Sequence, residues 1–260
     1  MLYRRTQHRP PVVFADDQMS HPATLPFIRE TCDRYGAALH IAKAARTPLE
    51  QWTRQGWPML GKLAARLWMQ KHRHRNMGFK IDVSSCCRNM KIAPARKLMR
   101  SLGFDMQMTG QRGQTDDALR GLRALKDSTM VYVKTDKLWI ANPLTGFTDI
   151  MIRRYIEQNG LQEHPAKSAG ACTIGCLFCG GGAQFTNSGF PILRRQAPDL
   201  WRWFMVEAGA GEIILAVKHD KPLAAIRDTL AQMGGLAAVA EKTPWIFDFL
   251  AITPRQGYLK

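Results

Sequence analysis

The sequence lacks any long hydrophobic run. No stretch of about 18 apolar residues occurs in the 260-residue chain, so no membrane-spanning helix is expected. The apolar segment of a secretory signal peptide is missing too, because Met1–Arg5 leads quickly to Pro10 and Pro11. Internal repeats and low-complexity segments are also absent. These absences predict a cytoplasmic protein without membrane attachment, and its length allows a sizeable core.

Acidic residues are scarce relative to basic ones. There are 21 Asp and Glu against 37 Lys and Arg, which gives a formal net charge of +16 at pH 7. Such an excess favours polyanionic partners, among them nucleotides, DNA or RNA, and acidic protein surfaces. A solvated basic surface without such a partner is the simpler alternative.

The order of hydrophobic patterns predicts an α/β fold. Short apolar runs typical of buried strands occur at 11–15 and 38–42, and the segment 24–35 between them predicts a helix. The first run ends in Asp16 and Asp17, and the polar end of such a strand faces a ligand crevice in parallel sheets. The elements expected next are helix 60–72, helix 94–102, strand 104–109, helix 114–125, strands 129–134 and 137–141, and helix 148–158.

An irregular stretch of sequence follows the three glycines at 180–182. Farther on, Asp220 as N-cap and Pro222 in the first turn predict another helix. We therefore expect two parts. Residues 1–182 form an α/β domain that carries the clustered cysteines, and residues 183–260 form a small, mostly helical C-terminal extension.

Five of the six cysteines fall into two short clusters. Cys86 and Cys87 are adjacent. Cys176 and Cys179 form a C-x-x-C, with Cys172 four positions before it. In a reducing compartment, such clustering indicates metal binding or redox chemistry more often than a disulfide framework.

Adjacent thiolates favour an iron–sulfur cluster over a single metal ion. Two neighbouring cysteines are awkward ligands for one small tetrahedral ion, whereas each can bind a different iron of a cluster. Four thiolates are the usual complement of a [4Fe–4S] cluster. A zinc site with four cysteines, a disulfide and unconnected thiols stay open as alternatives. The candidate metal ligands are Cys86, Cys87, Cys176 and Cys179.

Five segments, taken in order, carry a family resemblance. They are Val13–Asp17 with His21–Thr24, Cys86–Pro94, Gly110–Arg112 with Thr115, Asp116 and Arg120, Trp139–Leu144 with Thr148–Ile156, and Ile174–Cys179. Together they resemble the phosphoadenosine phosphosulfate (PAPS) and adenosine phosphosulfate (APS) reductases, members of the adenine-nucleotide α-hydrolase-like superfamily. The resemblance implies a mostly parallel sheet flanked by helices.

The resemblance also implies roles for individual residues. In the cluster-bearing branch of the family, the double Cys and the C-x-x-C together hold a [4Fe–4S] cluster, so it implies the same for the four candidate ligands. The family's basic residues hold an anionic nucleotide near that cluster. By position, Lys91, Arg112 and Arg120 inherit this role, and Asp16 is the further candidate for nucleotide or substrate binding. Arg offers bidentate contacts to phosphate or sulfate, although each cation could instead be a surface residue.

Two features of the family have no counterpart in this sequence. The glycines and hydroxyls of its Ser-Gly-Gly-type phosphate loop do not occur before Phe14, and no Cys follows Cys179 to match the catalytic Cys of the family's C-terminal tail. A truncated sequence or a degenerate paralogue explains the missing loop. The sequence therefore leaves the catalytic residues unknown.

Two functions fit these observations. The first is an iron–sulfur enzyme of sulfur metabolism that reduces a sulfonucleotide or transfers sulfur through an adenine-nucleotide-bound substrate. The alternative is a non-catalytic iron–sulfur accessory protein, of a phage, mobile-element or CRISPR-associated kind, that binds nucleic acid or a protein partner. The expected ligands are a [4Fe–4S] cluster, with zinc as the alternative, and an adenine nucleotide or sulfonucleotide. DNA or RNA on the basic surface, a homo-oligomer and a protein complex stay open.

Overall fold

The structure is a computed structural model that describes residues 8–58, 62–72, 81–82, 85–113, 130–168, 174–180 and 189–242. The chain divides into two compact units. One consists of the residues up to Ile92 together with those from His164 onward, and the other is Ala93–Glu163. The division expected after residue 182 remains a prediction.

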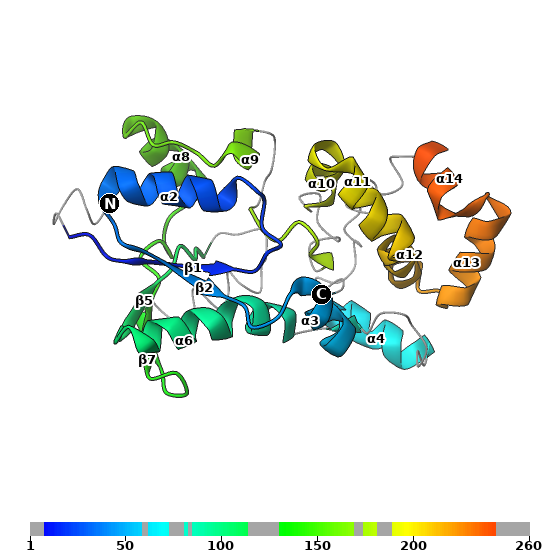
Figure 1. Ribbon diagram of the computed structural model, residues 1–260, viewed down its shortest axis with the longest axis horizontal. Helices are drawn as coiled ribbons and strands as arrows, with labels where there is room; N and C mark the ends of the chain where they lie inside the picture. Colours follow the sequence, from blue (N-terminus) through cyan, green and yellow to red (C-terminus); the bar gives the residue numbers. More distant parts are fainter. Residues whose placement is uncertain are drawn as a thin grey trace. The chain divides into compact units, whose positions relative to one another are not determined.

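The first unit contains short parallel strand pairs and many helices. Its elements are β1 (Val12–Asp16), α2 (Thr24–Tyr35), β2 (Leu39–Lys43), α3 (Pro48–Gln55), β3 (Trp57–Pro58), α4 (Lys62–His72), β4 (Ile81–Asp82), α5 (Ser85–Cys87), the π-helical turn η1 (Arg88–Ile92), α9 (Pro165–Ser168), α10 (Phe190–Gln196), α11 (Pro198–Arg202), the π-helical turn η3 (Trp203–Glu207), α12 (Ala210–His219), α13 (Leu223–Gln232) and α14 (Gly235–Lys242). β1 pairs in parallel with β2, and β3 with β4. The connecting helix α2 lies along the β1–β2 pair (Figure 1).

Local signals explain where two of these helices begin and end. The hydroxyl of Thr47 accepts the N–H of Glu50, whose carboxylate accepts the N–H of Thr47, so a capping box starts α3. α2 ends at Gly36, which has a left-handed φ of 61° that glycine adopts without steric cost. The structure confirms the helix predicted over 24–35.

Asp220 does not have the role that the sequence predicted. It occupies the left-handed C-cap of α12, with a φ of 51°, and α13 begins only after Pro222. Its carboxylate pairs with Lys71 and with His72 on α4. The predicted N-cap was wrong because these ion pairs and the end of α12 engage Asp220.

The C-terminal helices share one hydrophobic core with the N-terminal part of this unit. Phe204 of η3 packs against Trp52 and Trp57, with ring centroids 5.5 and 5.2 Å apart. Trp68 on α4 donates its indole N–H to the carbonyl oxygen of Lys221 at 2.9 Å. The described residues 189–242 are mostly helical, and their apolar side chains complete the core around β3.

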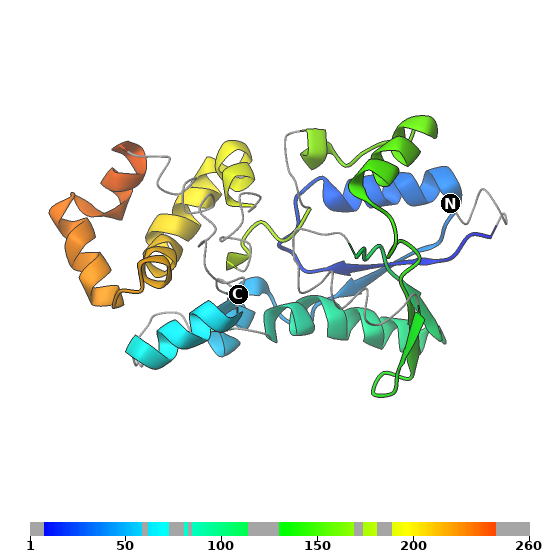
Figure 2. The ribbon, with the colours of Figure 1, turned by 180° about the vertical axis from the view of Figure 1, so that it is seen from behind.

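The second unit contains a three-stranded sheet and two helices within its described residues. Its elements are α6 (Ala93–Ser101), β5 (Met106–Met108), β6 (Met130–Val133), β7 (Leu138–Ala141) and α8 (Asp149–Gln158). The strand order is β5–β7–β6, with β5 parallel to β7. β6 and β7, which correspond to the strands predicted over 129–134 and 137–141, form an antiparallel hairpin drawn in green in Figure 2. The hydroxyl of Thr148 accepts the N–H of Met151 and caps α8, the helix predicted over 148–158.

The fold is α/β, as the sequence predicted. Of the four strand pairings seen in the described residues, three are parallel. The helix predicted over 114–125 lies outside the described residues. Among the helices that can be described, none has both the length and the apolar character needed to cross a bilayer.

Candidate metal centre

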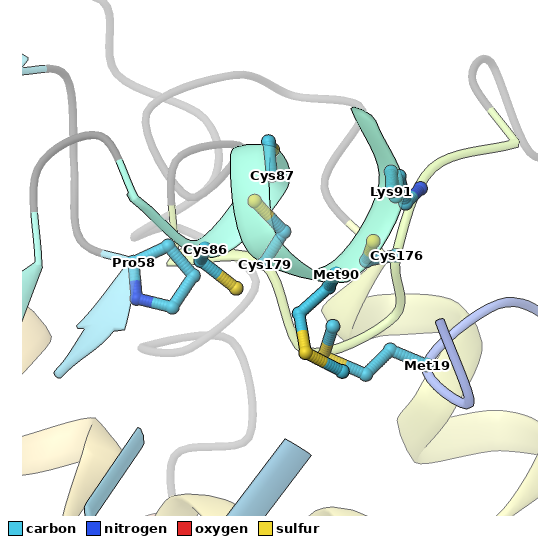
Figure 3. Close-up of a pocket in the computed structure, with 8 residues that line it drawn as sticks. All are labelled: Met19, Pro58, Cys86, Cys87, Met90, Lys91, Cys176 and Cys179. Atoms are coloured by element: carbon cyan, nitrogen blue, oxygen red, sulfur yellow. The ribbon is translucent and has the colours of Figure 1, made fainter. Parts of the chain in front are cut away.

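Four cysteines from two distant segments line one pocket of the first unit. Cys86 and Cys87 lie on α5, whereas Cys176 and Cys179 lie on the loop 174–180. Figure 3 shows the four side chains together at the pocket, with Cys179 next to Cys87. Cys86 is buried, Cys87 is exposed and the other two are half-buried. The remaining lining residues are Met19, Pro58, Met90 and Lys91.

The donor set is one that binds metal through thiolates. Four thiols from two distant parts of the sequence surround the same pocket. Four thiolates are the usual complement of a [4Fe–4S] cluster, and four cysteines also form a tetrahedral zinc site. The residues present therefore fit an iron–sulfur cluster or a zinc ion.

Backbone groups of the C-x-x-C loop are fixed by the surrounding core. The N–H of Leu177 donates to the carbonyl oxygen of Met19 at 2.8 Å. The indole N–H of Trp57 donates to the carbonyl oxygen of Phe178, also at 2.8 Å. The ring of Phe178 packs against Phe204 with centroids 5.1 Å apart. The loop thus has both polar and apolar anchors, which is the support that preorganised ligands need.

Two glycines let the chain pass close to this loop. A Cβ on Gly180 would lie 2.4 Å from the carbonyl oxygen of Pro58, and one on Gly189 would lie 2.8 Å from the Cα of Leu177. Both distances are shorter than any ordinary van der Waals contact. The packing of β3 and of α10 against the loop therefore requires glycine at both positions.

A buried ion pair lies beside Cys176. Asp17 is 0% exposed, and its Oδ2 accepts from the ammonium of Lys91 at 2.7 Å and from the thiol of Cys176 at 3.1 Å. Its Oδ1 accepts from the N–H groups of Met19 and Ser20, at 2.8 and 2.9 Å, and from the Ser20 hydroxyl at 3.1 Å. Both carboxylate oxygens are therefore occupied.

The same contacts determine the protonation states. Burial works to raise the pKa of Asp17, but the charge and hydrogen bonds of Lys91 outweigh it and lower that pKa. Burial works to lower the pKa of Lys91, but Cys176 and Asp17 raise it overall. Burial and the charge of Asp17 raise the pKa of the Cys176 thiol, against the opposing effect of Lys91. In the metal-free protein, Asp17 and Lys91 are therefore charged and Cys176 is a neutral donor.

The predicted nucleotide-binding residues do not all lie at this pocket. Lys91 does. Asp16 instead accepts the N–H of Gln18 at 3.1 Å and is absent from the lining. Arg112, in the second unit, forms an ion pair with Asp149. Arg120 and Cys172 lie outside the described residues. The nucleotide-binding roles of Asp16, Lys91, Arg112 and Arg120 remain predictions.

Asp17 was missed as a site residue. The sequence shows two acidic residues at the end of the first strand, and the prediction selected Asp16. In the structure, Asp16 is the last residue of β1 and lies opposite Lys43 of β2. Asp17 follows the strand, and its side chain is buried. The adjacent acidic pair was the available signal, but only tertiary structure shows which member is buried.

The chain is similar in sequence to known proteins. The sequence model of the phosphoadenosine phosphosulfate reductase domain matches residues 1–181. Phosphoadenosine 5'-phosphosulfate reductase of Alkalilimnicola ehrlichii is 26% identical over 174 residues, which cover 67% of this chain and 61% of that protein. Adenosine 5'-phosphosulfate reductase of Mycobacterium tuberculosis is 33% identical over 94 residues, which cover 36% of this chain and 34% of that protein.

One solved structure is also similar. It is the phosphate complex of phosphoadenylyl-sulfate reductase from Candida auris, with a TM-score of 0.43 and 20% identity, covering 68% of this chain and 72% of that one. The family match extends over residues 1–181, so it includes the C-x-x-C at Cys176 and Cys179. The chain belongs to the phosphoadenosine phosphosulfate reductase family.

Proposed function

We propose that this protein is an iron–sulfur sulfonucleotide reductase, which binds PAPS or APS and reduces its activated sulfate. The observation that supports this most is the pocket shared by four cysteines in a chain of this family. The A. ehrlichii and M. tuberculosis relatives carry the names of PAPS and APS reductases. The reduction takes two electrons from an external dithiol, which is oxidised to a disulfide while sulfite and the desulfated adenine nucleotide are released.

The cluster of this proposal is a [4Fe–4S] group, with Cys86, Cys87, Cys176 and Cys179 as its thiolate ligands. When bound, it supplies a polarisable, redox-active centre beside the pocket. The chain's own residues shape that environment. Met19 and Met90 are 3% and 1% exposed and limit the access of water to the sulfurs.

The substrate would be held by cations. Lys91, Arg112 and Arg120 are the proposed anion contacts, with Asp16 as a further substrate contact. Arg112 is half-buried, but its partner Asp149 is 58% exposed, so the guanidinium can exchange that carboxylate for a phosphate or sulfate. Arg matches these anions with two parallel hydrogen bonds.

Anaerobic purification followed by iron and acid-labile sulfide analysis tests the cluster. The expected result is about four of each per chain. A colourless protein that holds one zinc would overturn the cluster assignment. Sulfite release from PAPS and from APS with a dithiol reductant then tests the reaction, and calorimetry with both nucleotides tests binding. A loaded protein that binds neither nucleotide would contradict the reductase assignment.

A further inference from the structure

The buried carboxylate of Asp17 contacts Cys176, a candidate cluster ligand, and both of its oxygens are held by hydrogen bonds. Of the acidic residues that the structure describes, it is the one that is buried. Three donors of Met19 and Ser20 hold Oδ1, so the carboxylate cannot rotate away. Oδ2 is thereby aimed at Lys91 and Cys176.

We propose that Asp17 is a positioning residue for the metal centre: it holds the ammonium of Lys91 against Cys176 and offsets its charge, which keeps the reduction potential of the bound cluster low. This proposal rests on the iron–sulfur function proposed above. It assigns no contact between Asp17 and the substrate or the irons.

Metal binding changes what Cys176 can do in this arrangement. In the structure, its thiol donates to Oδ2 of Asp17 at 3.1 Å. A cysteine that binds iron does so as a thiolate, so this donor is lost and two negative groups face each other. The ammonium of Lys91 has three N–H donors and already contacts Asp17 at 2.7 Å. It can donate to both groups at once, and Asp17 keeps it in the position to do so.

The direction of the change in reduction potential follows from the charges near the cluster. Reduction adds an electron to the cluster, so a nearby positive charge favours the reduced state and a nearby negative charge disfavours it. Lys91 alone would raise the potential. Asp17, fully buried and in contact with Lys91, cancels much of that charge in a region where water screens little.

The test is the midpoint potential of the cluster in wild type and in Asp17→Asn, measured by anaerobic redox titration with electron paramagnetic resonance. The variant keeps the shape of the side chain and removes its charge. We expect a positive shift that raises the ratio of reduced to oxidised cluster about tenfold, which is about 59 mV for one electron. The matched control is Asp33→Asn, which removes the same charge from an exposed position on α2 outside the pocket lining and whose potential stays at the wild-type value.

A second pair of variants covers the case in which Asp17→Asn does not fold or load. Lys91→Met should lower the potential, and adding Asp17→Asn to it should raise the potential back toward wild type. Removing both members of a buried pair is also better tolerated than removing one. The proposal is overturned if the potential does not change between Lys91→Met and the double variant, or if Asp17→Asn and Asp33→Asn have equal potentials. A wild-type protein without iron and sulfide overturns the proposed function itself, and the iron assay separates that result from the others.

Discussion

The thiol of Cys176 donates a hydrogen bond to the buried carboxylate of Asp17 at 3.1 Å, although 159 positions separate the two residues. This contact joins the turn after β1 to the loop that carries the C-x-x-C. The buried carboxylate would be costly without its partners, because an unpaired buried charge loses its hydration. The end of the first strand and the candidate metal centre are therefore stabilised together.

Loss of one candidate ligand should release the metal. Cys179→Ala removes a thiolate that lines the pocket, and we expect the purified variant to lose most of its iron and sulfide. Cys32→Ala is the control, because Cys32 is buried on α2 and does not line the pocket. It should keep the wild-type iron content. Equal iron in the two variants would contradict the ligand assignment.

Gly180→Ala should destabilise the loop of the metal centre. The new Cβ would meet the carbonyl oxygen of Pro58 at 2.4 Å and the ring of Trp57 at 2.9 Å, and a backbone atom in a strand cannot easily move. We expect a loss of about 1–3 kcal/mol in the free energy of unfolding, measured with urea. Gly146→Ala meets nothing within 4 Å and should change that free energy by less than about 0.5 kcal/mol.

Trp57→Phe removes the N–H that the carbonyl oxygen of Phe178 accepts. The free energy of unfolding of this variant should be lower by about 1–3 kcal/mol, because a buried acceptor loses its partner. Trp139→Phe is the matched control, since Trp139 is 40% exposed in the second unit. Similar losses from the two variants would show that the indole hydrogen bond is unimportant.

Stability should fall in mild acid because of His164. Its Nδ1 accepts the N–H of Ala166, so the tautomer inferred from this contact places the proton on Nε2, beside the hydroxyl of Thr24. Burial, and then the nearby His21, lower the pKa of His164 below its ordinary value of 6.5. The unfolded chain therefore binds a proton that the folded chain excludes. The stabilising contribution is complete above pH 6.5 and is lost as the pH falls toward the lower folded pKa.

Urea unfolding at pH about 7.5 and about 5.5 measures this dependence. The free energy of unfolding should be lower at the acidic pH in the wild-type protein. His164→Gln should reduce the difference between the two pH values. An unchanged difference in the variant would assign the acid sensitivity to another group.

Arg112→Gln tests the proposed anion contact. Loss of a charged hydrogen bond costs about 1.5–3 kcal/mol, so the affinity for PAPS or APS should fall about tenfold or more in calorimetry. Arg153→Gln removes the same charge from an exposed position on α8 and is the control. Equal weakening by both variants would indicate a general charge effect instead of a specific contact.

Features with local causes could be predicted from the sequence. The ends of α2 and α8 follow from Gly36 and Thr148, which act through neighbouring backbone groups. Asp220 shows the limit of that reasoning. Its sequence context is that of an N-cap, but an ion pair with Lys71 and a contact with the His72 ring, both far away in the chain, determine its place.

The candidate site was predictable to a similar extent. Cysteine spacing and the family resemblance identified the four residues that line the pocket. The burial of Asp17 and the need for glycine at position 180 depend on contacts with segments distant in sequence. No periodicity or short motif contains that information. The roles of Arg112 and Arg120 still depend on the resemblance alone.

The aromatic contact between Phe178 and Phe204 has a thermodynamic consequence. It joins the C-x-x-C loop to the helices that follow residue 189, beyond the part of the chain that matches the family. Linkage is reciprocal, so a metal group that orders the loop also stabilises those helices, and the helices strengthen metal retention by the same free energy. In the proposed iron–sulfur protein, the affinity for iron would therefore be a property of the whole first unit, and substitutions in a distant helix core would be detected as faster iron release.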